Sequence, residues 1–266
     1  MAYGMVLLVV LLLLLLVLGV LVLLLLVVAV CPGGMAYTNR YCPWAHRAHI
    51  ALSELGLEFD EVSIDLSKPR EAWYLAINPR GLVPALKIGD DEILIESGII
   101  TQYLADVYAP RLLPATGSAA AALQRARISL FVDVFASAFG SALTGILIAA
   151  RTTAEKEAKA HAVVAAVKRD LVPLLADAAP FFGGSKELTL AEVNTASFVL
   201  RVYALGTEEY GWFPSFLLKE LKEIEVWQKW VDALLAQKSV TAIWNQQENA
   251  EVWRSKLAKL EEERKV

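Results

Sequence analysis

The distribution of apolar and polar positions divides the chain into three parts. Residues 6–30 are almost entirely leucine and valine, and no charged side chain occurs before residue 40. Residues 35–108 alternate short apolar runs with turns, whereas long patterns of helical period follow from 115 onward. The sequence therefore predicts an apolar segment over 1–30, a mixed α/β domain over 35–108 and an all-helical domain over 115–266.

The elements predicted for the middle part follow the order β-α-β-α-β-β-α. Gly56 is placed to end the first helix, and Asn78-Pro79-Arg80-Gly81 is placed to form a turn. Strands are expected at 35–38, 59–66, 82–88 and 93–95, and helices at 43–55, 71–76 and 97–108. Helices and strands are thus mixed within one domain, and Tyr108–Pro114 is expected to link it to the helices that follow.

The C-terminal part is expected to be helical over 117–150, 153–178, 189–206 and 215–237, with a charged surface helix over 248–266. Thr189 and Glu192 have the spacing of a capping box, which predicts a helix start. Aromatic side chains recur at helical spacing, including Phe135 and Trp230. Packing in a core is the simple interpretation; the alternative is that Phe135 and Trp230 line an open acceptor pocket.

The apolar segment 1–30 allows three interpretations. A helix over 5–30 is long enough to cross a hydrocarbon core of about 30 Å, which predicts a membrane anchor. A cleaved signal peptide is the second interpretation, but the apolar run is longer than the usual apolar region of such a peptide, and no Lys or Arg precedes it. Its near two-letter composition also fits an extension foreign to the folded protein. If it is an anchor, Arg40 and Arg47 after the span favour the cytosolic side; otherwise we expect a cytoplasmic protein.

Composition narrows the function classes. The chain has 266 residues and a net charge of −4, which argues against a nucleic-acid partner because there is no basic stripe. Two cysteines, Cys31 and Cys42, do not make a disulfide framework. From Cys31 onward the chain has the composition of an ordinary soluble protein.

Cys42 is the strongest candidate for a reactive group. It directly precedes a predicted helix whose first residue is Pro43, and Pro is well suited to that position. The unpaired N–H groups and the dipole of a helix N-terminus are expected to lower the pKa of a thiol there below the free value of about 8.5. Ala45 stands where a second thiol of a Cys-X-X-Cys motif would be, which indicates monothiol chemistry. A buried, inert thiol is the alternative. His46 is interpreted as a surface or packing residue, with a role in assisting Cys42 as the alternative, and Arg47 as a helix or interface charge.

Three motifs in register with this order of elements resemble the thioredoxin-like domain of cytosolic glutathione transferases. They are most similar to the omega class and its fungal relatives, and comprise Cys42-Pro43-Trp44-Ala45, Asn78 to Pro84, and Glu96-Ser97-Gly98. The resemblance implies an α/β thioredoxin-like N-terminal domain plus an all-α C-terminal domain, the glutathione transferase fold, here preceded by a hydrophobic N-terminal helix.

The resemblance implies glutathione as substrate and no metal. Val83-Pro84, with the proline cis in the family, is expected to pair with the cysteinyl unit like an added strand. Ser97 and its N–H are expected to hold the γ-glutamyl carboxylate at a helix N-terminus, and Glu96 the γ-glutamyl ammonium. An edge-strand proline and a plain N-cap are the structural alternatives.

The glycyl carboxylate is assigned to a cation near residue 68. Lys68 occupies the position where the family often has a cation, and Arg70 is the alternative because the alignment slips around Pro69. The simpler interpretation of Lys68 is a solvated surface charge.

The activity implied is thiol transfer, dehydroascorbate reduction or removal of glutathione from conjugates, with an apolar or disulfide co-substrate. Classical conjugation is expected to be weak, although Tyr37, Thr38 and Tyr41 leave a hydroxyl option open. A membrane-tethered adaptor that has lost its chemistry, and a chloride-channel-like protein of the same fold, are the rival hypotheses. The family usually forms homodimers, so a second copy and a membrane join glutathione as expected partners.

Overall fold

The structure is a computed structural model that describes residues 34–108 and 110–265. The apolar segment 1–30 and Cys31 lie outside the described residues, so the expectations for an anchor and for its orientation remain predictions. Arg40 and Arg47 are both part of the folded domain, Arg40 in an ion pair with Glu61 at 2.9 Å and Arg47 in the interior.

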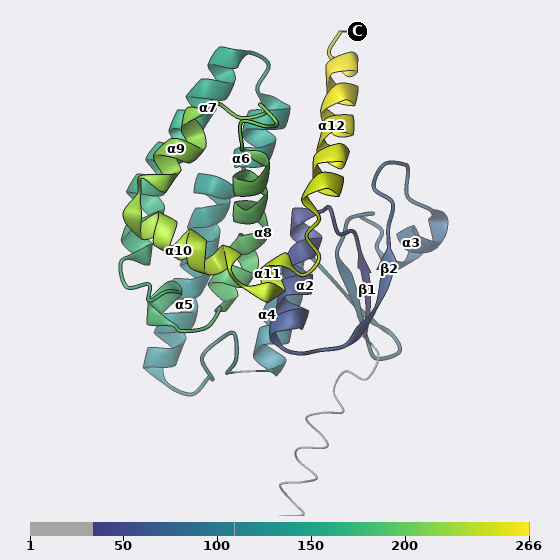
Figure 1. The fold of residues 1–266 in the computed structure, drawn as a ribbon. Helices are drawn as coiled ribbons and strands as arrows, with labels where there is room; N and C mark the ends of the chain where they lie inside the picture. The colour runs from purple at the N-terminus through teal and green to yellow at the C-terminus, as the bar shows by residue number, and fades with distance from the viewer. Residues whose placement is uncertain (1–33, 109, 266) are drawn as a thin grey trace, which may run out of the picture.

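One four-stranded sheet organises the N-terminal half (Figure 1). Its strand order is β2-β1-β3-β4, with β1 parallel to β2 and antiparallel to β3, and with β3 and β4 antiparallel. The strands are β1 (Gly34–Thr38), β2 (Phe59–Ser63), β3 (Ala85–Ile88) and β4 (Glu92–Ile95). The third strand begins at Ala85 rather than at 82, because Pro84 has no N–H to contribute to the ladder.

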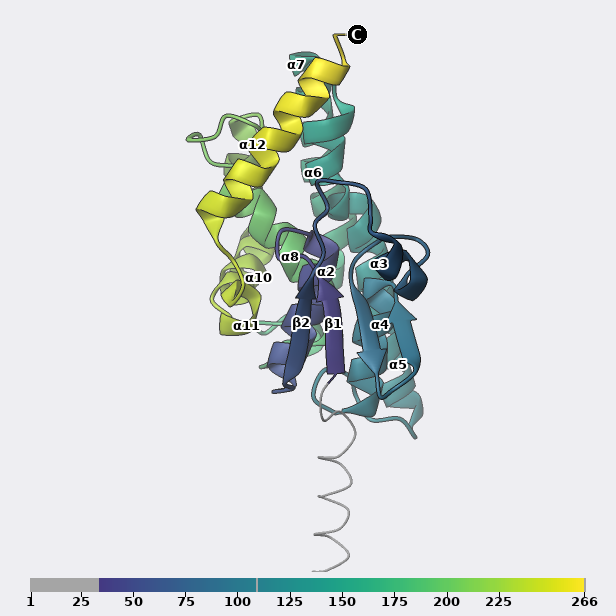
Figure 2. The ribbon, with the colours of Figure 1, turned by 90° about the vertical axis from the view of Figure 1, so that its right-hand side faces the viewer.

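Helices cover both faces of this sheet. α2 (Pro43–Glu54) and α4 (Ser97–Val107) lie between the sheet and the helical half (Figure 1). α3 (Ala72–Ile77) packs on the opposite face (Figure 2). On that face the rings of Tyr37 and Tyr74 are 5.9 Å apart. This is the predicted arrangement, a thioredoxin-like α/β domain joined to a helical domain.

The helical half is built around α8 (Leu190–Leu205), nearly all of which is buried. Thr189 and Glu192 form the predicted capping box at its start. The predicted helix 215–237 is two helices, separated at Glu223 and Ile224. The other helices are α5 (Ala119–Phe135), α6 (Ala142–Thr144), α7 (Thr153–Ala166), α9 (Phe216–Lys222), α10 (Glu225–Leu235), α11 (Lys238–Thr241) and α12 (Gln246–Glu263), with shorter π turns at Ala136–Gly140, Gly145–Ala149 and Val167–Leu171 and 3-10 turns at Pro173–Leu175 and Phe182–Gly184.

Two segments contain buried side chains where their composition alone would suggest a membrane span or an exposed surface helix. The run Ala119–Ala149 is long and apolar enough to cross a membrane by length and composition, yet Phe131 and Phe139 within it are fully buried in the helical core. The charged tail is a helix, α12, as predicted, but it is not only a surface helix. Trp253 and Asn249 are buried, and α12 starts beside the N-terminus of α2 (Figure 1).

Candidate functional site

The sheet brings the separate sequence motifs to one edge. Tyr37 of β1 is opposite Ala85 of β3, and Ala85 is opposite Ile95 of β4. The segment that leads from β1 to Cys42, the Val83-Pro84 pair that enters β3, and the Glu96-Ser97 pair that leaves β4 therefore emerge side by side. The chain after β2, which carries Lys68, leaves the sheet at the same edge, because Thr38 pairs in parallel with Ser63.

Cys42 is the N-cap residue of α2, as the sequence predicts. It is half-buried and free, and Pro43 takes the first position of the helix. No side chain among the described residues caps this N-terminus, so N–H groups of its first turn stay available to an anion. Asn39 fixes the approach, because its carbonyl accepts from the Cys42 N–H at 3.0 Å and its Oδ1 from the Tyr41 N–H at 3.0 Å.

The loop before β3 is held from two directions. The Val83–Pro84 peptide bond is cis. The carbonyl of Leu82 accepts from Asn78 Nδ2 at 2.8 Å and from the Tyr74 hydroxyl at 2.5 Å. Gly81 has a φ of +63°, and a Cβ there would come within 3.0 Å of the Arg70 side chain, so both conformation and space favour glycine. Val83 and Cys42 pack in the same apolar cluster, so the predicted nucleophile lies beside the segment predicted to bind glutathione.

Glu96 and Ser97 occupy the start of α4. Glu96 adopts a φ of 70° and forms an ion pair with Arg80. Ser97 is the first helical residue and is buried, and no side chain of the described residues caps this helix either. The hydroxyl of Ser97 accepts from Arg47 Nη1 at 3.4 Å. A second uncapped N-terminus thus lies beside the first, with a hydroxyl in place of a thiol.

The two candidate cations for the glycyl carboxylate, Lys68 and Arg70, differ in the protein groups that they already contact. Arg70 donates to backbone carbonyls, at 3.0 Å to Gly81 and 2.6 Å to Asp65, and so fastens the loop after β2 to the turn before β3. Lys68 is exposed, with its Nζ 3.7 Å from both Asp65 and Glu71. The exposed ammonium of Lys68 is therefore the better placed of the two for a ligand carboxylate.

The residues that follow Cys42 on α2 point inward. His46 is fully buried and its Nδ1 lies 3.1 Å from Arg201 Nη1. Burial, together with the charge of Arg201, holds the pKa of His46 well below its usual range, so the imidazole is neutral. Arg47 is buried as well, with its guanidinium 4.4 Å from the centre of the Trp44 ring. The burial of His46 fits the packing interpretation, and Arg47 is a buried charge between α2, α4 and α8, where it contacts Ser97 and Phe198.

Arg201 is a residue that the sequence prediction missed. It is fully buried on α8, and it donates to the carbonyl of Arg40 at 3.2 Å and to the carbonyl of Ser197 at 3.0 Å. Its signal in the sequence is a single charge within the otherwise uncharged stretch 193–205 of a core helix. Such a charge needs a reason, because an arginine is rarely buried without a partner.

Two of the three hydroxyl alternatives, Thr38 and Tyr41, have partners elsewhere, and the ring of the third, Tyr37, is packed against α3. Thr38 is buried, and its Oγ1 lies 2.8 Å from His49 Nε2. The hydroxyl of Tyr41 donates to Glu248 of α12 at 3.0 Å, and this hydrogen bond raises the Tyr41 pKa. Tyr37 is buried against Trp73 and Tyr74. These contacts favour Cys42 over a hydroxyl as the reacting group.

The proposed acceptor-pocket residues Phe135 and Trp230 do not line an open pocket, and that prediction is wrong. Phe135 has 0% and Trp230 has 1% of its surface exposed. The Trp230 Nε1 donates to Glu192 at 2.9 Å, and the Phe135 ring stacks on Trp227. Their helical spacing marks the inner face of the bundle, as the core-packing interpretation states.

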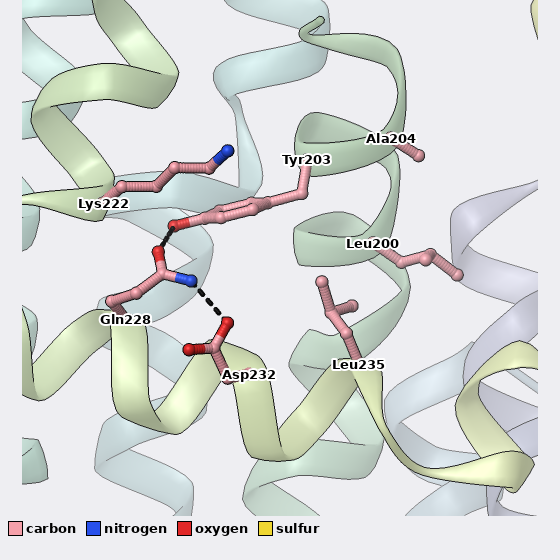
Figure 3. A pocket seen from close by; sticks show the side chains of 7 residues that line it. All are labelled: Leu200, Tyr203, Ala204, Lys222, Gln228, Asp232 and Leu235. Carbon is pink, nitrogen blue, oxygen red and sulfur yellow. Dashed lines mark hydrogen bonds between the residues drawn. The ribbon is translucent and has the colours of Figure 1, made fainter.

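A cleft of about 550 Å³ lies in the helical half between α8, α9 and α10, and none of the predicted site residues lines it (Figure 3). Its polar side chains bind one another. The Tyr203 hydroxyl donates to Gln228 at 3.1 Å, and the Gln228 amide donates to Asp232 at 2.6 Å (Figure 3). This cleft is therefore separate from the Cys42 edge, and its amide and hydroxyl groups are already used.

Comparison with known proteins agrees with this geometry. Residues 41–107 match the family Glutathione S-transferase, N-terminal domain. Glutathione S-transferase omega-2 of the mouse is 34% identical over 98 residues, which are 37% of this chain and 39% of the mouse protein. The chain thus spans about two fifths of the length of this relative.

Solved structures share the fold over a longer stretch. Glutathione transferase Omega 2C from Trametes versicolor superposes with a TM-score of 0.71 at 24% identity, covering 85% of this chain and 98% of that protein. Rice GST1 in complex with glutathione superposes with a TM-score of 0.70 at 22% identity, covering 85% of this chain and 97% of that one. At such identity the likeness shows the fold, and the site has to be argued from its residues.

Proposed function

We propose that the protein is an omega-like glutathione transferase that uses Cys42 as a nucleophile for thiol transfer. The observation that carries the proposal is the meeting of Cys42, Val83-Pro84 and Ser97 at one sheet edge, with two uncapped helix N-termini. A thiolate and a carboxylate are the anions that such termini accept. The omega-class names of the sequence relatives and the glutathione in the rice complex support the same substrate.

Each group then has one role. The glutathione backbone pairs with Val83, its γ-glutamyl carboxylate binds Ser97 and the N–H groups of α4, and Glu96 pairs with the ammonium. Lys68 pairs with the glycyl carboxylate.

The reaction is an exchange of sulfur bonds. The Cys42 thiolate attacks the glutathione sulfur of a mixed disulfide, a bond forms between these two sulfurs, and the co-substrate sulfur leaves as a thiolate that takes a proton from solvent. A second glutathione thiolate then attacks the glutathione sulfur held by Cys42, which releases oxidised glutathione and restores the Cys42 thiolate. With Ala45 in place of a second cysteine, resolution by the protein's own thiol is not available at this motif.

The decisive experiment measures thiol transfer from a glutathione mixed disulfide by the full chain and by Cys42→Ala. We expect the variant to lose activity by at least about 10³-fold, because removal of a nucleophile removes the covalent path. Cys31→Ser is the matched control and should keep full activity. An active Cys42→Ala protein excludes the cysteine mechanism.

The adaptor hypothesis is the second candidate, in which the fold binds a partner without chemistry. Binding to immobilised glutathione separates the two hypotheses. A protein that neither binds glutathione nor transfers thiols fits the adaptor, while binding with transfer fits the enzyme. The association of the chain with membranes through residues 1–30 is tested independently by carbonate extraction.

A further inference from the structure

Two arginines near Cys42 are buried without a carboxylate. Arg47 has 5% and Arg201 has 0% of its surface exposed. Other arginines of the described chain do have acidic partners, such as Arg40 with Glu61 and Arg127 with Asp177. Among residues 34–108 and 110–265, neither Arg47 nor Arg201 has an ion pair with an acidic side chain. A buried cation without a counter-charge is strongly unfavourable, so a source of negative charge is needed nearby.

Arg201 contacts the segment that carries the thiol, and Arg47 lies on the helix that begins at the thiol and stacks on Trp44 of its first turn. Arg201 reaches from α8 and donates to the carbonyl of Arg40, two residues before Cys42, at 3.2 Å. Ser197, one turn earlier on α8, donates to the carbonyl of Pro43 at 2.8 Å, which fixes α8 against the start of α2. Arg47 is one turn along α2 from Cys42 and donates to Ser97 Oγ at 3.4 Å.

The hydrogen bonds that these arginines make are to neutral groups. Arg201 contacts two carbonyls and the neutral His46, and Arg47 contacts a hydroxyl and the faces of Trp44 and Phe198. In each guanidinium the Nε is buried and has no hydrogen-bond partner within the described part of the chain. Burial lowers the pKa of each arginine to about 10 and attraction to Cys42 opposes this, so both remain cations at neutral pH.

The remaining charged groups around Cys42 do not supply the missing anion. From α2, burial lowers the pKa values of His46 and His49, which favours their neutral forms. Glu61 of β2 is bound to Arg40, and Glu248 of α12 accepts from the Tyr41 hydroxyl.

We propose that Arg47 and Arg201 are positioning residues that hold Cys42 in its thiolate form, and that this thiolate is the counter-charge of the two buried cations. The inference rests on the proposed function in taking Cys42 as the reacting group. It adds that the thiolate depends on Arg201 of the helical half. The α/β domain alone therefore lacks one of the cations that stabilise the thiolate.

The test is the pH dependence of Cys42 alkylation by iodoacetamide in the full chain, followed by mass of the Cys42 peptide so that Cys31 does not interfere. Arg201→Gln and Arg47→Gln should each move the midpoint of the rate profile upward by about 1 pH unit, the lower end of the effect of a close opposite charge. Arg201→Lys and Arg47→Lys keep the charge and should stay nearer the wild-type midpoint. Arg127→Gln, which loses a surface ion pair, is the matched control and should leave the midpoint unchanged.

A second readout is specific for charge. The ratio of the alkylation rates with iodoacetate and iodoacetamide should fall in both Gln variants, because the negative reagent loses the attraction of a cation. Unchanged midpoints and ratios in folded Gln variants overturn the proposal. If Arg201→Gln does not fold, Arg47→Gln carries the same test. Alkylation needs no glutathione, so a shifted midpoint together with absent thiol transfer would refute the proposed function and leave this inference standing.

Discussion

Two helices begin at the same edge of the sheet, and the proposed function assigns them anions from different sources. α2 starts after Cys42, whose own sulfur can carry the negative charge, and α4 starts with Ser97, whose hydroxyl is neutral. Neither N-terminus is capped by a side chain of the described residues, in contrast to α8 and α12, which Thr189 and Asn245 cap. An uncapped N-terminus leaves N–H donors free, so the α2 end suits an internal anion and the α4 end an anion brought by the ligand.

The difference extends one turn into each helix. Behind Cys42, α2 buries His46 and Arg47 against α8. Behind Ser97, α4 buries Thr101, whose hydroxyl donates to Asn194 at 3.2 Å. His46 and Arg201 thus lie under the start of α2, and Thr101 and Asn194 lie under the start of α4, while Arg47 reaches from α2 to Ser97. The lesson is that similar helix ends acquire different chemistry from the side chains packed beneath them.

The largest expected effect comes from making the two helix ends alike. Cys42→Ser replaces the nucleophilic sulfur by a hydroxyl that is not ionised at neutral pH, so thiol transfer should fall by at least about 10³-fold. Binding to immobilised glutathione should be retained, because the other binding groups are unchanged. A gain of conjugation with an electrophilic aromatic substrate would show that a hydroxyl at this position can support the bound glutathione thiolate.

A smaller effect is expected at the second helix end. Ser97→Ala removes one hydrogen bond to a charged carboxylate, which is worth about 1.5–3 kcal/mol. The KM for glutathione should therefore rise by roughly 10–100-fold, while the pH midpoint of Cys42 alkylation changes little. Ser137→Ala, an exposed serine of the helical half, is the control. If Ser97→Ala leaves the KM unchanged, the assignment of the γ-glutamyl carboxylate to α4 is wrong.

The two candidate cations beside this edge should respond in opposite ways. Lys68→Ala should raise the KM for glutathione by a few-fold, since an exposed ion pair contributes up to about 1 kcal/mol, and should leave the melting temperature unchanged. Arg70→Ala should lower the free energy of unfolding by about 1–3 kcal/mol, because the carbonyls of Gly81 and Asp65 lose their donor. Kinetics and thermal melting of both variants make the comparison, and the reverse pattern would assign the glycyl carboxylate to Arg70.

The last effect concerns His46 and is expected in stability, not in activity. Its pKa is lowered by burial, so the unfolded chain takes up a proton near pH 6.5 that the folded chain does not, and stability must fall as the pH drops below that value. The slope is at most about 1.4 kcal/mol per pH unit for one such group. Chemical denaturation of His46→Gln between pH 7 and pH 5 should show a shallower decline than the wild type. His161→Gln, at an exposed position of α7, should decline as the wild type does.

Much of the α/β domain was predictable because its signals are local. Pro43 after Cys42, Gly81 at a positive φ and the alternation of short apolar runs define the starts and ends of elements within a few residues. The capping box at Thr189 is equally local. The prediction for Phe135 and Trp230 failed because helical spacing shows that a side chain faces inward, and does not distinguish a core from an open pocket.

The sequence by itself determined where the candidate groups lie along the chain: one thiol placed at a helix start, one serine placed at another, and a loop with glycine and proline between them. Only the tertiary structure decided how these groups are charged and supported. Arg201 lies 159 residues beyond Cys42 in the chain, and its approach to the Cys42 segment depends on the packing of α8 against α2. Local pattern fixes conformation, because caps and turns involve neighbouring residues, but the electrostatics of a buried site sum over all elements around it.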